Sequence, residues 1–457
     1  MSLFRKKSLE SVIAENGQKS FKPTMRTLDL VLFGIAAIVG SGVMVLTGVA
    51  SASAGPAVIF SFLLAGLACT IVALCYAEMA SAIPSSGSTY SYMYVVLGEI
   101  IAYKIGWVLL GGYILTAAAV ANGWSKYFNS LLSGMGINLG EKFTTIPQDG
   151  GIANAPAIIA ILLLTVLLTR GTSESKMINN ILAFIKVSIV LLFIVVGSFH
   201  INIENWTNDF APAGFSGVMV GATTVFFAYL GLDAISTSAE ETINPEKTLP
   251  KAILITMLVC TSLYIAVCLV LTGVVPYSQL GTGNALVYVL TEVGQTKAAW
   301  LISLGASIGL MAGVLSFMYA AVRIAFTMAR DGLLPNSLAK VNKNQVPNRL
   351  TWITGLLTAF FAGFLPLGQL SEIATVAAII AFMLVAYATI KFRKSHPNAK
   401  RGFKVPAMPF VPGLAIAIFI FLIITSVTLT TWLITIGWML VGAVIYFMYS
   451  IKNSKAK

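Results

Sequence analysis

Apolar residues gather into about twelve stretches, most of them close to the roughly 20 residues that cross a bilayer as a helix. This pattern predicts an all-α integral membrane protein, because hydrocarbon offers no water to backbone groups and a helix bonds them internally. The predicted spans are 28–51, 57–80, 97–122, 155–168, 176–199, 215–238, 251–275, 298–326, 350–365, 372–390, 409–426 and 430–449.

Small and polar residues interrupt the first of these spans at Gly40, Ser41 and Gly42. Glycines beside a serine at this depth weaken the helical hydrogen-bond ladder and free N–H and C=O groups. The sixth span has small and polar residues at a matching depth, within residues 226–233. Paired interruptions of this kind indicate an inverted repeat with a binding site where the broken helices cross. For the first span, a glycine-rich packing face for a neighbouring helix is the alternative.

Counting five spans per repeat predicts the domain organisation. Residues 1–27 form an N-terminal tail, 28–199 the first inverted repeat, 215–390 the second, 409–449 a final helix pair, and 450–457 a C-terminal tail. The longest external loops are expected at 123–154 and 277–297. None of the connections is long enough for a separate soluble domain.

Composition and charge agree with a membrane location. The chain is 57% hydrophobic and 10% charged, whereas soluble domains carry about 25% charged residues. Its net charge of +12 is explained by the membrane topology, because the basic residues gather on one side of the membrane. With both termini in the cytoplasm, all but five of the 29 Lys and Arg residues fall on the inner side, as the positive-inside rule requires. The exceptions are Lys104, Lys126, Lys142, Lys186 and Lys297. We therefore expect a multi-pass protein of the cell membrane and no nucleic-acid partner.

Titratable residues at membrane depth are too few for catalysis. The four cysteines, Cys69, Cys75, Cys260 and Cys268, lie inside predicted spans and resemble small buried apolar residues. With only two histidines, the chain offers no transition-metal cluster. No paired-carboxylate or Ser/His arrangement appears within the spans, so the sequence predicts neither an enzyme nor a cofactor.

The first interruption has the chemistry of a zwitterion site. N–H groups of Gly40, Ser41 and Gly42 at a half-helix end suit a carboxylate. Freed carbonyls suit an ammonium group; the candidates are Ile38, Val39, Phe227, Ala228 and Leu230. Together they describe an α-amino acid substrate, although other zwitterions or small anions would satisfy much of the same pattern.

Two charged residues lie within the predicted spans near this site. Lys186 is central in the fifth span, where a buried ammonium is costly and marks a functional position by default. It either binds and releases the coupling proton or acts as a structural cation that bonds the carbonyls of the first span. Asp233 follows the second interruption. It can counter a cationic substrate side chain, pair with Lys186 or cap the second half-helix.

Five short motifs follow one another along the chain. They are Gly34-Ile35-x-x-Ile38-Val39-Gly40-Ser41-Gly42; Tyr76-Ala77-Glu78; Pro84-x-x-Gly87-Ser88-x-Tyr90; Phe226-Phe227-Ala228-Tyr229-x-Gly231-x-Asp233 with Glu240-Glu241-x-x-Asn244-Pro245; and Arg330-Asp331-Gly332-Leu333-Leu334-Pro335. In this order the chain resembles the amino acid–polyamine–organocation permeases, and within them the bacterial cationic amino acid transporter branch. The resemblance extends over essentially the whole chain.

This resemblance implies the leucine-transporter-type fold, a five-plus-five inverted repeat with discontinuous helices 1 and 6. It further implies alternating access and sodium-independent amino acid uptake. It assigns proton coupling to Lys186, the outer gate to Phe227, carboxylate binding to residues 40–42, and the side-chain end of the pocket to Met318.

One departure from the resemblance concerns selectivity. Bacterial relatives place an acidic residue in the third helix where this chain has Gly112, and residues 109–113 contain no carboxylate. A pocket without that anion would hold lysine or arginine less well, so we expect neutral amino acids and protons as partners. A cationic amino acid or polyamine transporter, an exchanger, and a substrate-sensing receptor are the alternatives.

Overall fold

The computed structural model describes residues 5–12, 23–40, 42–281 and 284–455 of the chain, and each predicted span coincides with a helix or a helix pair there. Within these residues, eight helices are long and apolar enough to cross a membrane. Shorter apolar helices are Thr27–Ile38, Ala155–Thr169 and Phe410–Ile424. The principal helices are α2 (Thr27–Ile38), α3 (Thr47–Ala54), α4 (Val58–Ala82), α5 (Thr89–Val96), α6 (Glu99–Gly134), α7 (Glu141–Thr144), α8 (Ala155–Thr169), α9 (Thr172–Ser198), α11 (Gly214–Phe226), α12 (Pro245–Val274), α13 (Ala285–Glu292), α14 (Thr296–Arg330), α15 (Asn348–Phe364), α16 (Leu367–Ser395), α17 (Phe410–Ser426), α18 (Leu429–Ile445) and α19 (Ile451–Asn453).

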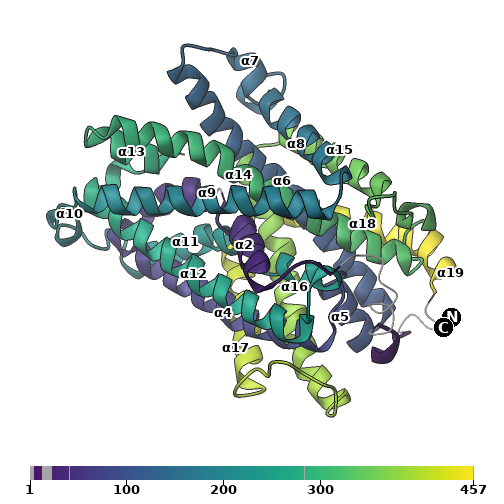
Figure 1. Ribbon diagram of the computed structural model, residues 1–457. Helices are drawn as coiled ribbons and strands as arrows, with labels where there is room; N and C mark the ends of the chain where they lie inside the picture. The colour runs from purple at the N-terminus through teal and green to yellow at the C-terminus, as the bar shows by residue number, and fades with distance from the viewer. Residues whose placement is uncertain (1–4, 13–22, 41, 282–283, 456–457) are drawn as a thin grey trace.

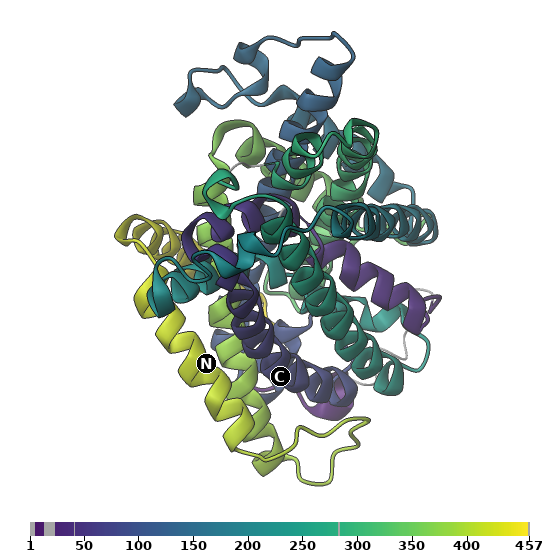
Figure 2. The ribbon, with the colours of Figure 1, turned by 90° about the vertical axis from the view of Figure 1, so that its left-hand side faces the viewer.

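The main differences from the sequence prediction lie at the end of the third span and in the connection before it. Helix α6 continues to Gly134, through the first part of the predicted external loop 123–154, and Trp124 and Phe128 stack one turn apart on it at 4.7 Å between ring centroids. Helix α5 lies in a stretch predicted as a plain connection between the second and third spans. It was missed because eight residues are too short to resemble a span. The short α7 lies on a segment that projects from the helices (Figures 1 and 2).

The broken first helix lies among long helices. Helix α2 packs against α9, α12 and α14, and α14 in turn packs along α6. Glycines in α14 permit close packing against α9: a β-carbon at Gly309 would lie 2.9 Å from the β-carbon of Lys186. The arrangement brings one backbone carbonyl of α2 within reach of a side chain from α9.

The first and last described segments of the chain lie close together at one end of the molecule, which we call the terminal end (Figure 1). Arg5, near the N-terminus, donates to the Ile451 carbonyl oxygen of α19 at 3.4 Å. At the same end Met25, before α2, forms a parallel β-bridge with Thr242. The backbone leading into the first broken helix is therefore joined to the backbone leaving the sixth.

Candidate functional site

The first predicted interruption is a true break in the helix. Helix α2 ends at Ile38, and Val39 leaves the helical conformation with ψ near 83°. A five-residue π-helix, Gly42–Leu46, then leads into α3. Gly40 and Gly42 are buried on either side of Ser41, a predicted site residue that lies outside the described residues.

The sixth helix is broken as well. After α11 the chain forms a single 3₁₀ turn, Phe227–Tyr229, and then extends at Leu230. Gly231 takes φ +108°, a conformation that side chains rarely adopt, and a second 3₁₀ segment follows at Ala234–Glu241. The prediction of discontinuous helices 1 and 6 is confirmed.

The two breaks touch each other at glycines. A β-carbon at Gly42 would overlap Ala228, and one at Gly231 would lie 2.9 Å from the β-carbon of Ala37. Around Gly40 the backbone is less crowded, since the nearest atom to an added β-carbon would be Val120 Cγ2 at 3.8 Å. The predicted carboxylate-binding and ammonium-binding segments are thus brought together at the crossing.

Tyr264 of α12 forms hydrogen bonds to both helix breaks. Its hydroxyl group contacts the carbonyl oxygens of Ile38 at 2.7 Å and Ala228 at 2.8 Å. One hydroxyl hydrogen is shared between these two acceptors, and each carbonyl oxygen keeps a second lone pair. Two of the carbonyls predicted to be free for an ammonium group therefore already have a partner. Sequence reasoning missed Tyr264, because its hydroxyl is one of several in the predicted span 251–275 and nothing distinguishes it there.

Lys186 reaches the first break from α9. Its side chain is fully buried, and Nζ donates to the Ala36 carbonyl oxygen at 2.8 Å. Ala36 precedes the end of α2, so the ammonium group lies on a helix-one carbonyl as one of the two interpretations of Lys186 expected. Gly313 of α14 packs against this contact, since an added β-carbon would lie 3.1 Å from the Ala36 carbonyl oxygen and 3.7 Å from Nζ.

Asp233 is bound by a residue that the sequence did not single out. Its Oδ2 accepts a hydrogen bond from the Tyr113 hydroxyl of α6 at 2.5 Å, and both side chains are buried. The Asp233 side chain makes no capping bond to the 3₁₀ segment that follows. Among the described residues its side-chain partner is Tyr113, whereas Lys186 bonds Ala36.

Gly112 and Met318 occupy different surroundings from Tyr113. A β-carbon at Gly112 would lie 2.9 Å from that of Ala377 in α16, and Gly112 lines an apolar cavity of about 210 Å³ between α6, α16 and α18. Met318 is fully buried in α14. Phe227, at the start of the 3₁₀ turn, is also buried, with 6% of its surface exposed. The α14 residue next to the sixth-helix break is Phe317, whose Cζ would lie 3.0 Å from a β-carbon at Gly231.

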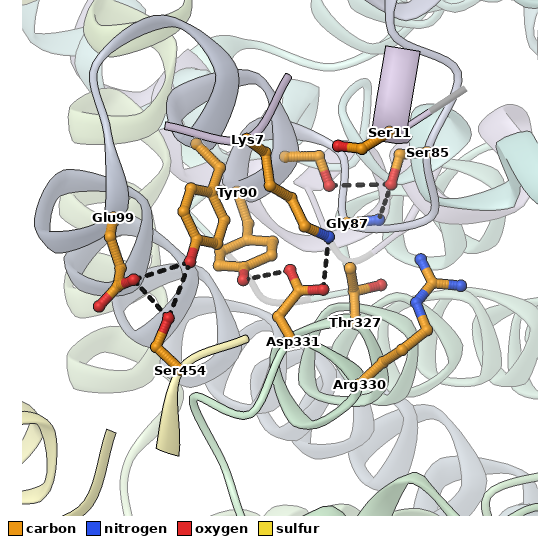
Figure 3. A network of polar contacts seen from close by, with 12 residues as sticks. Lys7, Ser11, Ser85, Gly87, Tyr90, Glu99, Thr327, Arg330, Asp331 and Ser454 are labelled. Carbon is orange, nitrogen blue, oxygen red and sulfur yellow. Dashed lines mark hydrogen bonds and ion pairs between the residues drawn. The ribbon is translucent and has the colours of Figure 1, made fainter. Parts of the chain in front are cut away.

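Ion pairs close the terminal end of the molecule. The guanidinium group of Arg330 donates to both carboxylate oxygens of Glu240, at 3.0 and 3.1 Å. Glu240 lies near the end of the 3₁₀ segment that follows the sixth-helix break. Figure 3 shows Tyr90 and Lys7 both directed at Asp331, at 2.6 Å each. These residues come from the N-terminal segment, α5, the sixth helix and the end of α14, so this end is held shut by contacts between separate elements.

Comparison with known proteins gives one consistent result. A family model described as "Amino acid permease" matches residues 25–448. The chain is 46% identical over 457 residues to the methylthioribose transporter of Bacillus subtilis (strain 168), with 99% of both chains covered. It is 44% identical over 463 residues to a branched-chain amino acid permease of the same organism, again covering 99% of both. The vacuolar cationic amino acid transporter 4 of Arabidopsis thaliana is 35% identical over 407 residues, covering 87% of this chain and 68% of that protein.

Proposed function

Because the chain belongs to the amino acid permease family, we propose that it imports neutral amino acids, branched-chain ones first, across the cell membrane. Transport would proceed by alternating access with both termini in the cytoplasm and without chemical change to the substrate. The observation that carries the proposal is the crossing of the two helix breaks, where Gly42 meets Ala228 and Gly231 meets Ala37. At this crossing, backbone N–H groups of the first break would lie close to backbone carbonyls of the second, so that groups of opposite polarity would meet at one point.

The roles of the backbone groups follow from their polarity. N–H groups of residues 40–42 would bind the substrate carboxylate, and carbonyls of Val39, Leu230 and their neighbours Ile38 and Ala228 would bind its ammonium. Phe227 would close the pocket as the outer gate, with Met318 towards its side-chain end. The role predicted for Gly112 at that end is not part of the proposal, because Gly112 faces Ala377 of α16. Asp233 belongs to the same pocket through its position after Gly231.

A neutral substrate is supported by the hydrogen bonds that the two charged side chains near the crossing already make. The Asp233 carboxylate is bonded by Tyr113, and Lys186 is bonded by Ala36. Among the relatives, one is named a branched-chain amino acid permease at 44% identity, whereas the named cationic transporter is at 35%. A leucine-like side chain requires no charged partner, so it suits a pocket in which Asp233 and Lys186 are already hydrogen-bonded.

Methylthioribose is a second candidate substrate. The relative named for it is 46% identical over 99% of both chains. That compound has no net charge, so it shares the requirement for a pocket without a free carboxylate. It lacks the zwitterion that the helix breaks are suited to, which favours the amino acid.

Coupling is proposed to use protons and not sodium. The Lys186 ammonium lies on the Ala36 carbonyl, a place where a bound cation would otherwise satisfy the helix-one backbone. Loss of its proton would weaken the charge-assisted bond to that carbonyl and loosen α2 during turnover. An exchanger would need no such proton cycle.

The test is uptake of labelled leucine into proteoliposomes under an inward proton gradient, with sodium replaced by choline. Unlabelled leucine, alanine, lysine, arginine and methylthioribose serve as competitors. We expect proton-driven accumulation that neutral amino acids inhibit. Competition by lysine and arginine alone would contradict the proposed substrate class, and competition by methylthioribose alone would establish the second candidate.

A further inference from the structure

We propose that Tyr113 sets the charge selectivity of the pocket by occupying the Asp233 carboxylate, so that the site excludes cationic side chains such as those of lysine and arginine. The inference rests on the proposed function, and it assigns Tyr113 a role in specificity without contact to the transported group. The substrate class follows from whether one carboxylate oxygen is open or bonded.

The Asp233 carboxylate already has a hydrogen-bond donor. Its Oδ2 accepts the Tyr113 hydroxyl at 2.5 Å, and both side chains are buried. A buried carboxylate is tolerated when it is hydrogen-bonded. A lysine or arginine side chain entering the pocket would therefore compete with the Tyr113 hydroxyl for this carboxylate.

Tyr113 is held in place by its packing. Its ring lies 6.1 Å from that of Phe317 between centroids, and Phe317 in turn packs on Gly231 at the break. The ring is 4% exposed. The hydroxyl group cannot leave Asp233 without moving a ring that is wedged between α6, α14 and the broken sixth helix.

The position of Tyr113 on α6 explains how an acidic residue, Asp233, is accommodated in a pocket proposed for neutral amino acids. One residue earlier, Gly112 faces Ala377 in α16. Successive residues on a helix point about 100° apart, so the side of α6 that faces the break is the side of Tyr113. Asp233 therefore lies beside the crossing, and α6 supplies the hydroxyl group that donates to its Oδ2.

The experiment compares competition by lysine and arginine against labelled leucine in Tyr113→Phe and in the unchanged protein. Loss of a hydrogen bond to a charged group corresponds to about tenfold or more in affinity. We expect Tyr113→Phe to bring the lysine and arginine inhibition constants down by about that factor, while the constant for leucine changes much less.

Two controls separate this effect from general damage. Tyr127→Phe removes a phenol from the same helix, one that donates to the Met44 carbonyl oxygen at 2.9 Å and touches no carboxylate. It should leave lysine competition unchanged. The gain in Tyr113→Phe should vanish when Asp233→Asn is added, because an amide offers a cation no charge.

The outcomes are distinct. A folded Tyr113→Phe protein that binds leucine without gaining lysine competition overturns the proposal, as does a gain that persists with Asp233→Asn. If Tyr113→Phe fails to fold, Asp233→Asn alone decides: retained leucine transport with lysine still excluded supports the proposal, and lost leucine binding in a folded protein overturns it by making Asp233 a direct ligand. Failure of the proposed function has a separate signature, since the unchanged protein would then accumulate no leucine.

Discussion

The ammonium group of Lys186 lies 2.8 Å from the carbonyl oxygen of Ala36, so a side chain of α9 completes the hydrogen bonding of the broken first helix. The contact is fully buried and has no alternative in water. Any event that removes the proton from Lys186 therefore also changes what holds the end of α2. The contact relates the charge on one residue to the position of the helix that forms half of the site.

Replacing this lysine should uncouple transport from the proton gradient. In Lys186→Met we expect loss of proton-driven leucine accumulation, with exchange of internal for external leucine retained, because the crossing of the breaks is left in place. In proteoliposomes, the accumulation ratio measures proton-driven uptake and a counterflow assay measures exchange. Lys104→Met, at an exposed lysine of α6, is the matched control and should behave as the unchanged protein. Proton-driven accumulation by Lys186→Met would contradict the coupling role.

Tyr264 should matter for substrate affinity as well as stability. Tyr264→Phe leaves the carbonyls of Ile38 and Ala228 without their shared donor, and an unsatisfied buried polar group costs about 1–3 kcal/mol. We expect a lower melting temperature and weaker leucine binding, measured by thermal unfolding with and without leucine. Tyr229→Phe removes a hydroxyl that donates to the Phe62 carbonyl oxygen of α4 at 3.0 Å. It should lower stability without the added loss of binding.

Much of the architecture could be predicted from the sequence because lipid restricts the options. Apolar stretches of spanning length must be helices, and the interruptions at Gly40 and Gly231 are visible as small residues in such stretches. The predicted resemblance to amino acid permeases is confirmed by the family match over residues 25–448. The repeat boundaries at 199 and 215 stay a prediction, as does the side of the membrane that holds the termini.

The partners inside the site could not be predicted in the same way. Tyr113 and Tyr264 lie in apolar runs, and no local pattern tells which of the 15 tyrosines faces a break. Their roles depend on helix rotation and on contacts between segments more than 100 residues apart, such as Tyr113 with Asp233. Gly112 was singled out by alignment with relatives, yet the residue of α6 that reaches the break is the next one.

The close approach at Gly42 should be sensitive to a single methyl group. In Gly42→Ala the added carbon overlaps Ala228, so the two breaks must separate, and overpacking of this kind costs about 1–3 kcal/mol. We expect leucine uptake to fall sharply in protein that still inserts into the membrane, measured by uptake normalised to purified protein. Gly437→Ala in α18 meets no atom within 4 Å and should leave uptake unchanged. Normal uptake by Gly42→Ala would mean that the breaks do not form the site.

Opening of the terminal end should require the Glu240–Arg330 contact to break. Glu240 lies at the end of the sixth-helix 3₁₀ segment, its side chain is 4% exposed, and it also accepts from the Ser86 backbone N–H at 3.2 Å. Removing its charge in Glu240→Gln weakens the two-point bond to Arg330. A loss of about 1–3 kcal/mol would shift the population towards the open state by about 5- to 150-fold.

A buried cysteine can report this shift. Ser238 is fully buried two residues before Glu240, and the four native cysteines are buried too. In a Ser238→Cys background, Glu240→Gln should raise the labelling rate with a water-soluble maleimide, because the segment is exposed only when the terminal end opens. Glu141→Gln on the exposed α7 makes the same chemical change outside the closed end and should leave labelling slow. Equal labelling with and without Glu240→Gln would show that other contacts, such as Tyr90 and Lys7 on Asp331, keep this end shut by themselves.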